Sequence, residues 1–160
     1  MKKFIFKYLL ILVICSGFIS ACIKKTSYAT TPEIEYKAFY PYIGDSADIQ
    51  VKFKDGNGDI GVSKGDTTRT FWLTYYYKDS VTNKYVGYYR PLFNDTLKTG
   101  YVVNAPDDSY KGKAISGDIS IRIPRTRHIT AVKSIKYVIY MFDEAGNKSN
   151  VITTPELNLP

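Results

Sequence analysis

The chain has 160 residues, of which 44% are hydrophobic and 15% aromatic, and a formal net charge of +7 at pH 7. This is the length of one ordinary domain, with enough apolar residues for a buried core. The positive charges are spread along the sequence, whereas a nucleic-acid-binding protein carries a concentrated basic patch, so nucleic acid is not an expected partner. A single histidine and two cysteines exclude a transition-metal centre made of several such ligands.

Residues 1–21 have the organisation of a secretory signal peptide. Three lysines come first, an apolar run covers 8–18, and residues 19–22 read Ile-Ser-Ala-Cys. The apolar run is shorter than the roughly 20 residues that a membrane-spanning helix needs. Residues 19–22 resemble the bacterial lipobox, which implies cleavage before Cys22 and attachment of lipid to the Cys22 side chain and amine. The alternative is an ordinary thiol at the end of an ordinary signal.

Cleavage at this point changes both the charge and the cysteine content. It removes three of the 22 basic residues and leaves 19 against 15 acidic residues, a net charge of +4. It also removes Cys15, so no disulfide is expected in spite of export to an oxidising compartment. Ile23 follows the lipidated residue, and resemblance to the sorting rule of diderm bacteria implies the outer membrane. Lys24 and Lys25 replace the acidic run typical of surface display, which favours the periplasmic face.

The rest of the chain is predicted to be a tether and one folded domain. Residues 22–32 are polar, end in Pro32 and are interpreted as a flexible tether, and the domain occupies 33–160. Alternating β-branched and aromatic residues predict strands at 34–38, 49–54, 70–78, 84–90, 119–123, 135–142 and 150–157. Seven short strands separated by clusters of turn residues predict an all-β, immunoglobulin-like sandwich of two antiparallel sheets. A small β-barrel is the alternative architecture.

One loop carries residues suited to binding a metal ion. Residues 55–61 read Asp-Gly-Asn-Gly-Asp-Ile-Gly, which places oxygen-bearing side chains at Asp55, Asn57 and Asp59. Calcium prefers six to eight hard oxygen ligands, and this spacing matches the first part of the EF-hand loop. The match then ends, because Ile60 stands where that loop needs glycine and the preceding segment is a predicted strand. The loop is therefore not an EF-hand.

A fourth ligand is predicted from the topology of the sandwich. If 49–54 and 70–78 are the second and third strands, the Asp-rich loop and the turn at 143–148 lie at the same end. Asp143 would then join Asp55, Asn57 and Asp59 around a structural calcium ion. The alternative is an ordinary turn, because Asp, Asn and Gly are also the residues that long turns use.

The aromatic residues give a second candidate site. Among the 15 tyrosines and one tryptophan, Trp72, Tyr76, Tyr88 and Tyr89 fall on neighbouring predicted strands. Exposed tyrosine and tryptophan side chains are typical anchors of binding surfaces. The alternative is cross-strand aromatic pairing that only stabilises the sheet.

The residues give little indication of an enzyme. His128 is the only histidine and lies among arginines that lower its pKa, and no mature cysteine or second histidine can complete a nucleophile–base pair. The lipobox, the Asp-rich loop and the turn at 143–150 together resemble small, largely uncharacterised lipoproteins with an immunoglobulin-like domain in Gram-negative anaerobes. The resemblance implies a lipid-anchored envelope module without catalytic residues. We therefore predict a non-enzymatic binding or structural module for an envelope protein, with glycan binding as the alternative.

Overall fold

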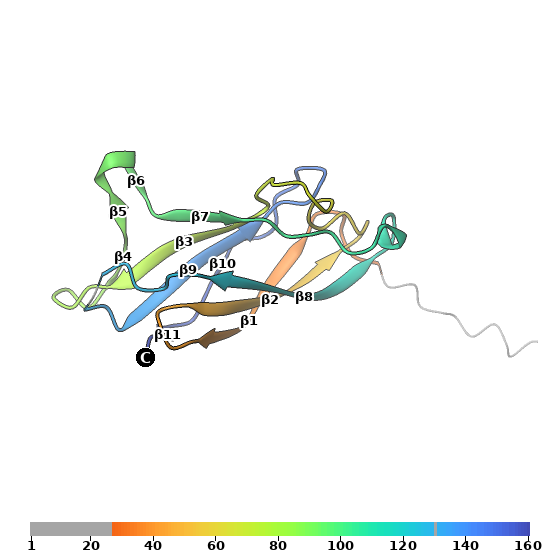
Figure 1. The fold of residues 1–160 in the computed structure, drawn as a ribbon. Coiled ribbons are helices and arrows are strands. Elements are labelled where there is room, and N and C mark those ends of the chain that lie inside the picture. The colour runs from red at the N-terminus through yellow and green to blue at the C-terminus, as the bar shows by residue number, and fades with distance from the viewer. Residues whose placement is uncertain (1–26, 130) are drawn as a thin grey trace, which may run out of the picture.

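The protein is described by a computed structural model that covers residues 27–129 and 131–160. It is an all-β fold of antiparallel sheets (Figure 1). The described chain contains no α-helix, only the two 3-10 turns η1 (Pro91–Phe93) and η2 (Asp108–Tyr110), and neither is long and apolar enough to cross a membrane. The predicted all-β sandwich is confirmed, and the alternative of a closed barrel is wrong, because the strands form separate sheets.

The first sheet has three long strands. They are β1 (Glu33–Pro41), β2 (Ala47–Asp55) and β8 (Ile115–Ile123), in the order β1-β2-β8. Alternation along β2 turns every second side chain toward the core, among them the fully buried Ile49 and Val51 and the partly buried Phe53. This period of two places one face of the sheet on the core and the other toward solvent.

The second sheet is built around two long central strands. Its main order is β10-β9-β3-β4, with β11 also pairing with β9 and β7 also pairing with β3. The strands are β3 (Phe71–Lys78), β4 (Tyr85–Gly87), β7 (Lys98–Tyr101), β9 (Ser134–Met141), β10 (Ile152–Thr153) and β11 (Leu157–Asn158). Both β4 and β7 lie along the edge of β3 that β9 leaves free.

A small hairpin interrupts that edge. The chain leaves the sheet after Gly87 and forms β5 (Tyr89–Arg90), η1 and β6 (Asp95–Thr96), then returns as β7. Figure 1 shows β5 and β6 rising away from the body of the sandwich. The two-stranded β5-β6 ladder is a third, separate sheet.

The core lies between the inner faces of the two large sheets. Phe71, Leu73 and Tyr75 of β3 are buried there, while Trp72 and Tyr76 are only half-buried on the outer face. The buried set from both sheets is one continuous cluster that includes Ile34, Ile49, Val51, Ile119, Ile121, Phe71, Leu73, Tyr75, Ile135, Ile139 and Met141. Burial of these side chains is the main term that holds the sheets together.

The strands differ from their prediction in number and detail. The described residues form eleven strands. The predicted strand 84–90 is broken at Tyr88, and the predicted strand 150–157 is reduced to β10 and part of β11. Strands β6 and β7 were not predicted. Neither sequence has the long alternation of apolar and polar residues that marks the central strands. These two strands form because they pair with their neighbours.

Candidate metal site

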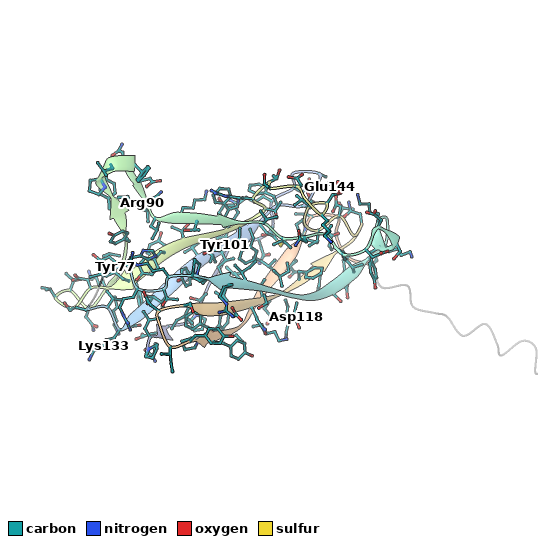
Figure 2. The ribbon with its side chains drawn as sticks, in the orientation of Figure 1. Tyr77, Arg90, Tyr101, Asp118, Lys133 and Glu144 are labelled. Atoms are coloured by element: carbon teal, nitrogen blue, oxygen red, sulfur yellow. The ribbon has the colours of Figure 1, made fainter. Side chains whose placement is uncertain are left out.

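The Asp-rich loop and the β9–β10 turn meet at one end of the sandwich. Asp55 is the last residue of β2, and the chain then turns so that Ile60 forms a β-bridge with Asp143, just beyond β9. The Glu144 amide donates to the Asp59 carbonyl at 2.9 Å. Glu144 marks this end of the molecule in Figure 2. The loop of one sheet is therefore joined to the turn of the other by backbone contacts.

Three carboxylates converge at this junction. Asp55, Asp59 and Asp143 each offer one carboxylate oxygen, and these oxygens all lie within 4.8 Å of one another. Asp55 is 0% exposed and Asp143 is 3% exposed. Acidic side chains are almost never this deeply buried unless a cation or hydrogen bonds compensate their charge.

Part of that compensation comes from the loops themselves. Asp55 Oδ2 accepts hydrogen bonds from the amides of Gly58 and Asp59, at 2.5 and 3.2 Å. The two carboxylate oxygens of Asp143 accept from the backbone and side-chain nitrogens of Asn147, at 2.7 and 2.8 Å. These bonds hold both carboxylates in fixed orientations.

Other oxygens at the site have no partner. The buried Oδ1 atoms of Asp55, Asn57 and Asp59 make no hydrogen bond to any described part of the chain. Most buried polar atoms in proteins are hydrogen-bonded, so three unpaired oxygens in one loop call for an explanation. Each is a carboxylate or amide oxygen, the kind of atom that coordinates a hard cation.

The electrostatics of the cluster are unfavourable without such a cation. Burial raises the pKa of the Asp59 carboxyl, and the negative charges of Asp143 and Asp55 raise it further, while the Asn57 side chain lowers it. Across residues 27–129 and 131–160, no lysine or arginine forms a salt bridge with any of the three carboxylates. The buried acidic triad could therefore hold a metal ion, and its donors are all oxygens.

The loop is enclosed by segments that the sequence did not associate with it. A Cβ on Gly56 would lie 2.4 Å from the Tyr28 carbonyl oxygen, and one on Gly58 would lie 2.1 Å from the Tyr110 carbonyl oxygen. The Gly112 amide also donates to the Asn57 carbonyl at 2.6 Å. No sequence pattern signalled these contacts, because they join segments far apart along the chain.

Three of the four residues predicted to bind metal are thus brought to one place, and the fourth, Asn57, lies in the same short segment of chain as two of them. Asp55 comes from the end of β2, Asp59 from the loop that follows and Asp143 from the turn after β9. The side-chain oxygen of Asn57 in the loop is also buried. The segment before the loop is a strand, which agrees with the expectation that this is not an EF-hand.

The four predicted aromatic anchors are not brought to one place. Trp72 and Tyr76 lie on the outer face of the second sheet, and Lys98 Nζ lies 4.7 Å from the centre of the Trp72 ring. Tyr88 instead packs toward the core, edge to face with Tyr75 at 6.3 Å. Tyr89 is exposed on the hairpin β5-β6.

The His128 side chain packs against aromatic rings. Its ring is 4.8 Å from that of Tyr75 and 5.7 Å from that of Tyr88. Burial, and then the charge of Arg125, lower the pKa of His128. The arrangement is that of a neutral packing residue.

Comparison of the sequence with protein-family models and with curated proteins, and of the fold with solved structures, gives no match. The function must therefore be argued from the residues of this chain. The predicted lipidation site Cys22, the signal peptide 1–21 and residues 22–26 of the predicted tether lie outside the described residues. The end of that tether, at Tyr28 and Ala29, lies against Gly56 of the Asp-rich loop.

Proposed function

We propose that this chain is an exported, lipid-anchored envelope protein whose single immunoglobulin-like domain binds a protein partner and is stabilised by calcium. The signal peptide and lipobox support the location, with Cys22 attached to the outer membrane and the domain on its periplasmic face. The strand orders β1-β2-β8 and β10-β9-β3-β4 support the fold, because they match strands A-B-E and G-F-C-C′ of immunoglobulin sandwiches.

The observation that carries the calcium proposal is the set of unpaired buried oxygens on Asp55, Asn57 and Asp59 beside the carboxylate of Asp143. Calcium accepts irregular sets of carboxylate, amide and carbonyl oxygens, whereas magnesium demands a near-ideal octahedron. A divalent ion here would neutralise the repulsion that raises the pKa of Asp59. It would also hold the loop of one sheet against the turn of the other, which is a structural role and not a catalytic one.

The test is a comparison of thermal midpoints with calcium, with magnesium and with a chelator. The protein is the chain from Cys22 to Pro160 carrying Cys22→Ser. Calcium should raise the midpoint, since a ligand in hundredfold excess over its Kd adds about 2.7 kcal/mol to the free energy of unfolding. Magnesium should raise it less. An unchanged midpoint in saturating calcium would contradict the proposal.

A matched pair of variants distinguishes loss of the ion site from the general effect of removing one acidic residue. Asp59→Asn should abolish the calcium shift, yet in chelator it should be at least as stable as the wild type, because it removes one of three repelling charges. Asp108→Asn is the control, since its side chain is 87% exposed and makes only a 3.7 Å contact with Lys111. It should keep the full calcium shift.

Glycan binding is the second candidate, and it rests on the outer face of the second sheet. Lys98 Nζ lies over both the Trp72 and Tyr140 rings, at 4.7 and 5.0 Å, and Lys148 Nζ lies 4.2 Å from the Tyr140 ring. Such a face suits an acidic sugar better than a neutral one, because the lysines occupy the ring faces on which neutral sugars stack. Trp72 is the only tryptophan, so its fluorescence, titrated with acidic and neutral oligosaccharides, reports directly on this face.

A further inference from the structure

The hairpin at residues 89–96 stands off the edge of the second sheet. Figure 1 shows it rising near the end of the sandwich that lies away from the start of the described chain, and Arg90 marks it in Figure 2. No sequence motif singled it out. Its tip is the 3-10 turn η1, which contains no buried residue.

Backbone pairing along the edge of β3 is complete without this hairpin, as it would be if the hairpin were an insertion. The Tyr88 amide donates to the Tyr75 carbonyl at 3.3 Å, and the Tyr75 amide donates to the Leu97 carbonyl at 2.9 Å. The Leu97 amide in turn donates to the Tyr88 carbonyl at 2.8 Å. Pairing along β3 therefore continues directly from residue 88 to residue 97, and residues 89–96 are not needed to complete the sheet.

The hairpin is nevertheless held in one shape by its own side chains. Arg90 donates to both carboxylate oxygens of Asp95, at 2.9 and 2.6 Å, and its guanidinium lies 4.7 Å from the centre of the Phe93 ring. The Tyr89 hydroxyl donates to the side-chain oxygen of Asn94, which adopts a left-handed φ of 51°. A bidentate arginine–carboxylate pair gives geometric definition as well as energy.

This fixed shape presents apolar side chains to solvent. Leu92 is 95% exposed and Phe93 is 68% exposed, and Tyr89 is also exposed at the base. A single exposed apolar residue is common and needs no explanation. Leu92 and Phe93, however, are adjacent at the tip of a hairpin that its own side chains hold in one conformation. They resemble the preorganised anchor residues that fill pockets in protein interfaces, where rigidity lowers the entropic cost of binding.

The charge and position of the tip favour a protein over a lipid surface. Arg90 is neutralised by Asp95, and the hairpin contains no other charged residue, so it has no net attraction for anionic headgroups. Residues 27–32 enter the domain beside the Asp-rich loop, near the opposite end from the hairpin (Figure 1). A domain tethered through that end directs the hairpin away from its own membrane.

We infer that Leu92 and Phe93 form a docking knob that inserts into an apolar pocket on a protein partner in the envelope. This inference rests on the proposed function as a protein-binding module and names the surface that does the binding. It is independent of calcium, because the knob and the acidic triad lie at different ends of the fold (Figure 1).

The test is site-specific photo-crosslinking of the full-length chain in intact cells, followed by affinity measurement. A benzophenone amino acid is placed at Leu92, at Tyr76 on the outer face of the second sheet, and at Val81, an exposed residue of an unrelated turn. We expect one discrete protein adduct from position 92 and none from position 81. The crosslinked protein is then identified and purified, and its affinity is measured for the wild type and for Leu92→Asp with Phe93→Asp. The double variant should bind at least tenfold more weakly with an unchanged thermal midpoint.

The other outcomes overturn the inference in distinguishable ways. An adduct from position 76 and none from position 92 would leave the binding function standing and remove the knob from it. No protein adduct from any position would count against both. Binding of the wild type to vesicles of neutral and anionic phospholipid, lost in the double variant, would make the knob a membrane contact. A dimer in sedimentation that the double variant abolishes would make its partner a second copy.

Discussion

Asp59 shows how burial changes the meaning of an ordinary turn residue. Its pKa is raised first by burial and then by the charges of Asp143 and Asp55, while one oxygen of Asp55 and one of Asp59 lack any hydrogen bond within the described chain. In an exposed turn, the same side chains would be solvated and would repel each other weakly, because water screens charges. The low exposure of Asp55 and Asp143 is what makes a cation the natural partner of the cluster.

His128 carries a prediction at the same scale. Burial and Arg125 lower its pKa below the ordinary value of 6.5. The unfolded state then binds a proton more tightly than the folded state, so the free energy of unfolding should fall as pH drops below 6.5 and level off below the folded-state pKa. One proton can contribute a slope of at most about 1.4 kcal/mol per pH unit.

The check is urea denaturation of the wild type and of His128→Phe at pH 7, 6 and 5. Phenylalanine keeps a ring against Tyr75 and Tyr88 but cannot titrate. The wild type should lose stability relative to the variant over this range. Parallel pH profiles for the two proteins would show that His128 has the same pKa in the folded and unfolded states, which would contradict its burial against these rings.

At the scale of elements, the loop 55–61 depends on glycine for space as much as for backbone conformation. Gly58 has a φ of 69°, and a Cβ there would lie 2.1 Å from the Tyr110 carbonyl. The contact joins the loop to the segment around η2, which encloses the acidic cluster. A side chain at this position would therefore disturb the site even though it contributes no ligand.

Gly58→Ala should lower the free energy of unfolding in chelator, by about 1–3 kcal/mol for the strained backbone alone. The steric clash should add to this and should also weaken the calcium-induced rise in thermal midpoint. Gly65→Ala is the matched control, because Gly65 has a φ of 96° but open space where its Cβ would stand. If both variants lost equal stability, the packing of η2 on the loop would be unimportant.

At the scale of the whole molecule, one side chain links the edge of the first sheet to the end of the second. Asn150 lies just before β10, and its Oδ1 accepts from the Ile34 amide at 2.7 Å while its Nδ2 donates to the Ile34 carbonyl at 2.9 Å. The amide side chain thus pairs with β1 as a strand backbone would. It also satisfies backbone groups that would otherwise stand unpaired on an edge strand.

Asn150→Ala should destabilise the domain by about 1 kcal/mol, the usual net value of a hydrogen bond. The Ile34 amide should also lose protection in hydrogen exchange, while amides of the central strand β9 keep theirs in proportion to global stability. Asn158→Ala, at an exposed position of β11, serves as the control. Unchanged exchange at Ile34 would mean that β1 is held by β2 alone.

Much of the fold and of the candidate site could be predicted from the sequence, for local reasons. Strands β2, β3, β8 and β9 were found because alternation with a period of two is written into each strand by itself. Asp55, Asn57 and Asp59 were found because a short loop keeps them together in sequence. Asp143 was reachable because the sandwich topology places both loops at one end.

What could not be predicted depends on contacts between distant segments. The broken strand at Tyr88, the unpredicted strand β7 and the docking knob follow from how the chain returns to the edge of β3. Tyr88 was expected on the same surface as Trp72 but packs inward against Tyr75. The sequence by itself determined the long central strands and the acidic loop, and it predicts the export signal, since each is a local pattern. Only the tertiary structure decided which oxygens are buried without partners and which apolar residues are left in solvent, because burial is a property of the packed sheets and not of any one segment.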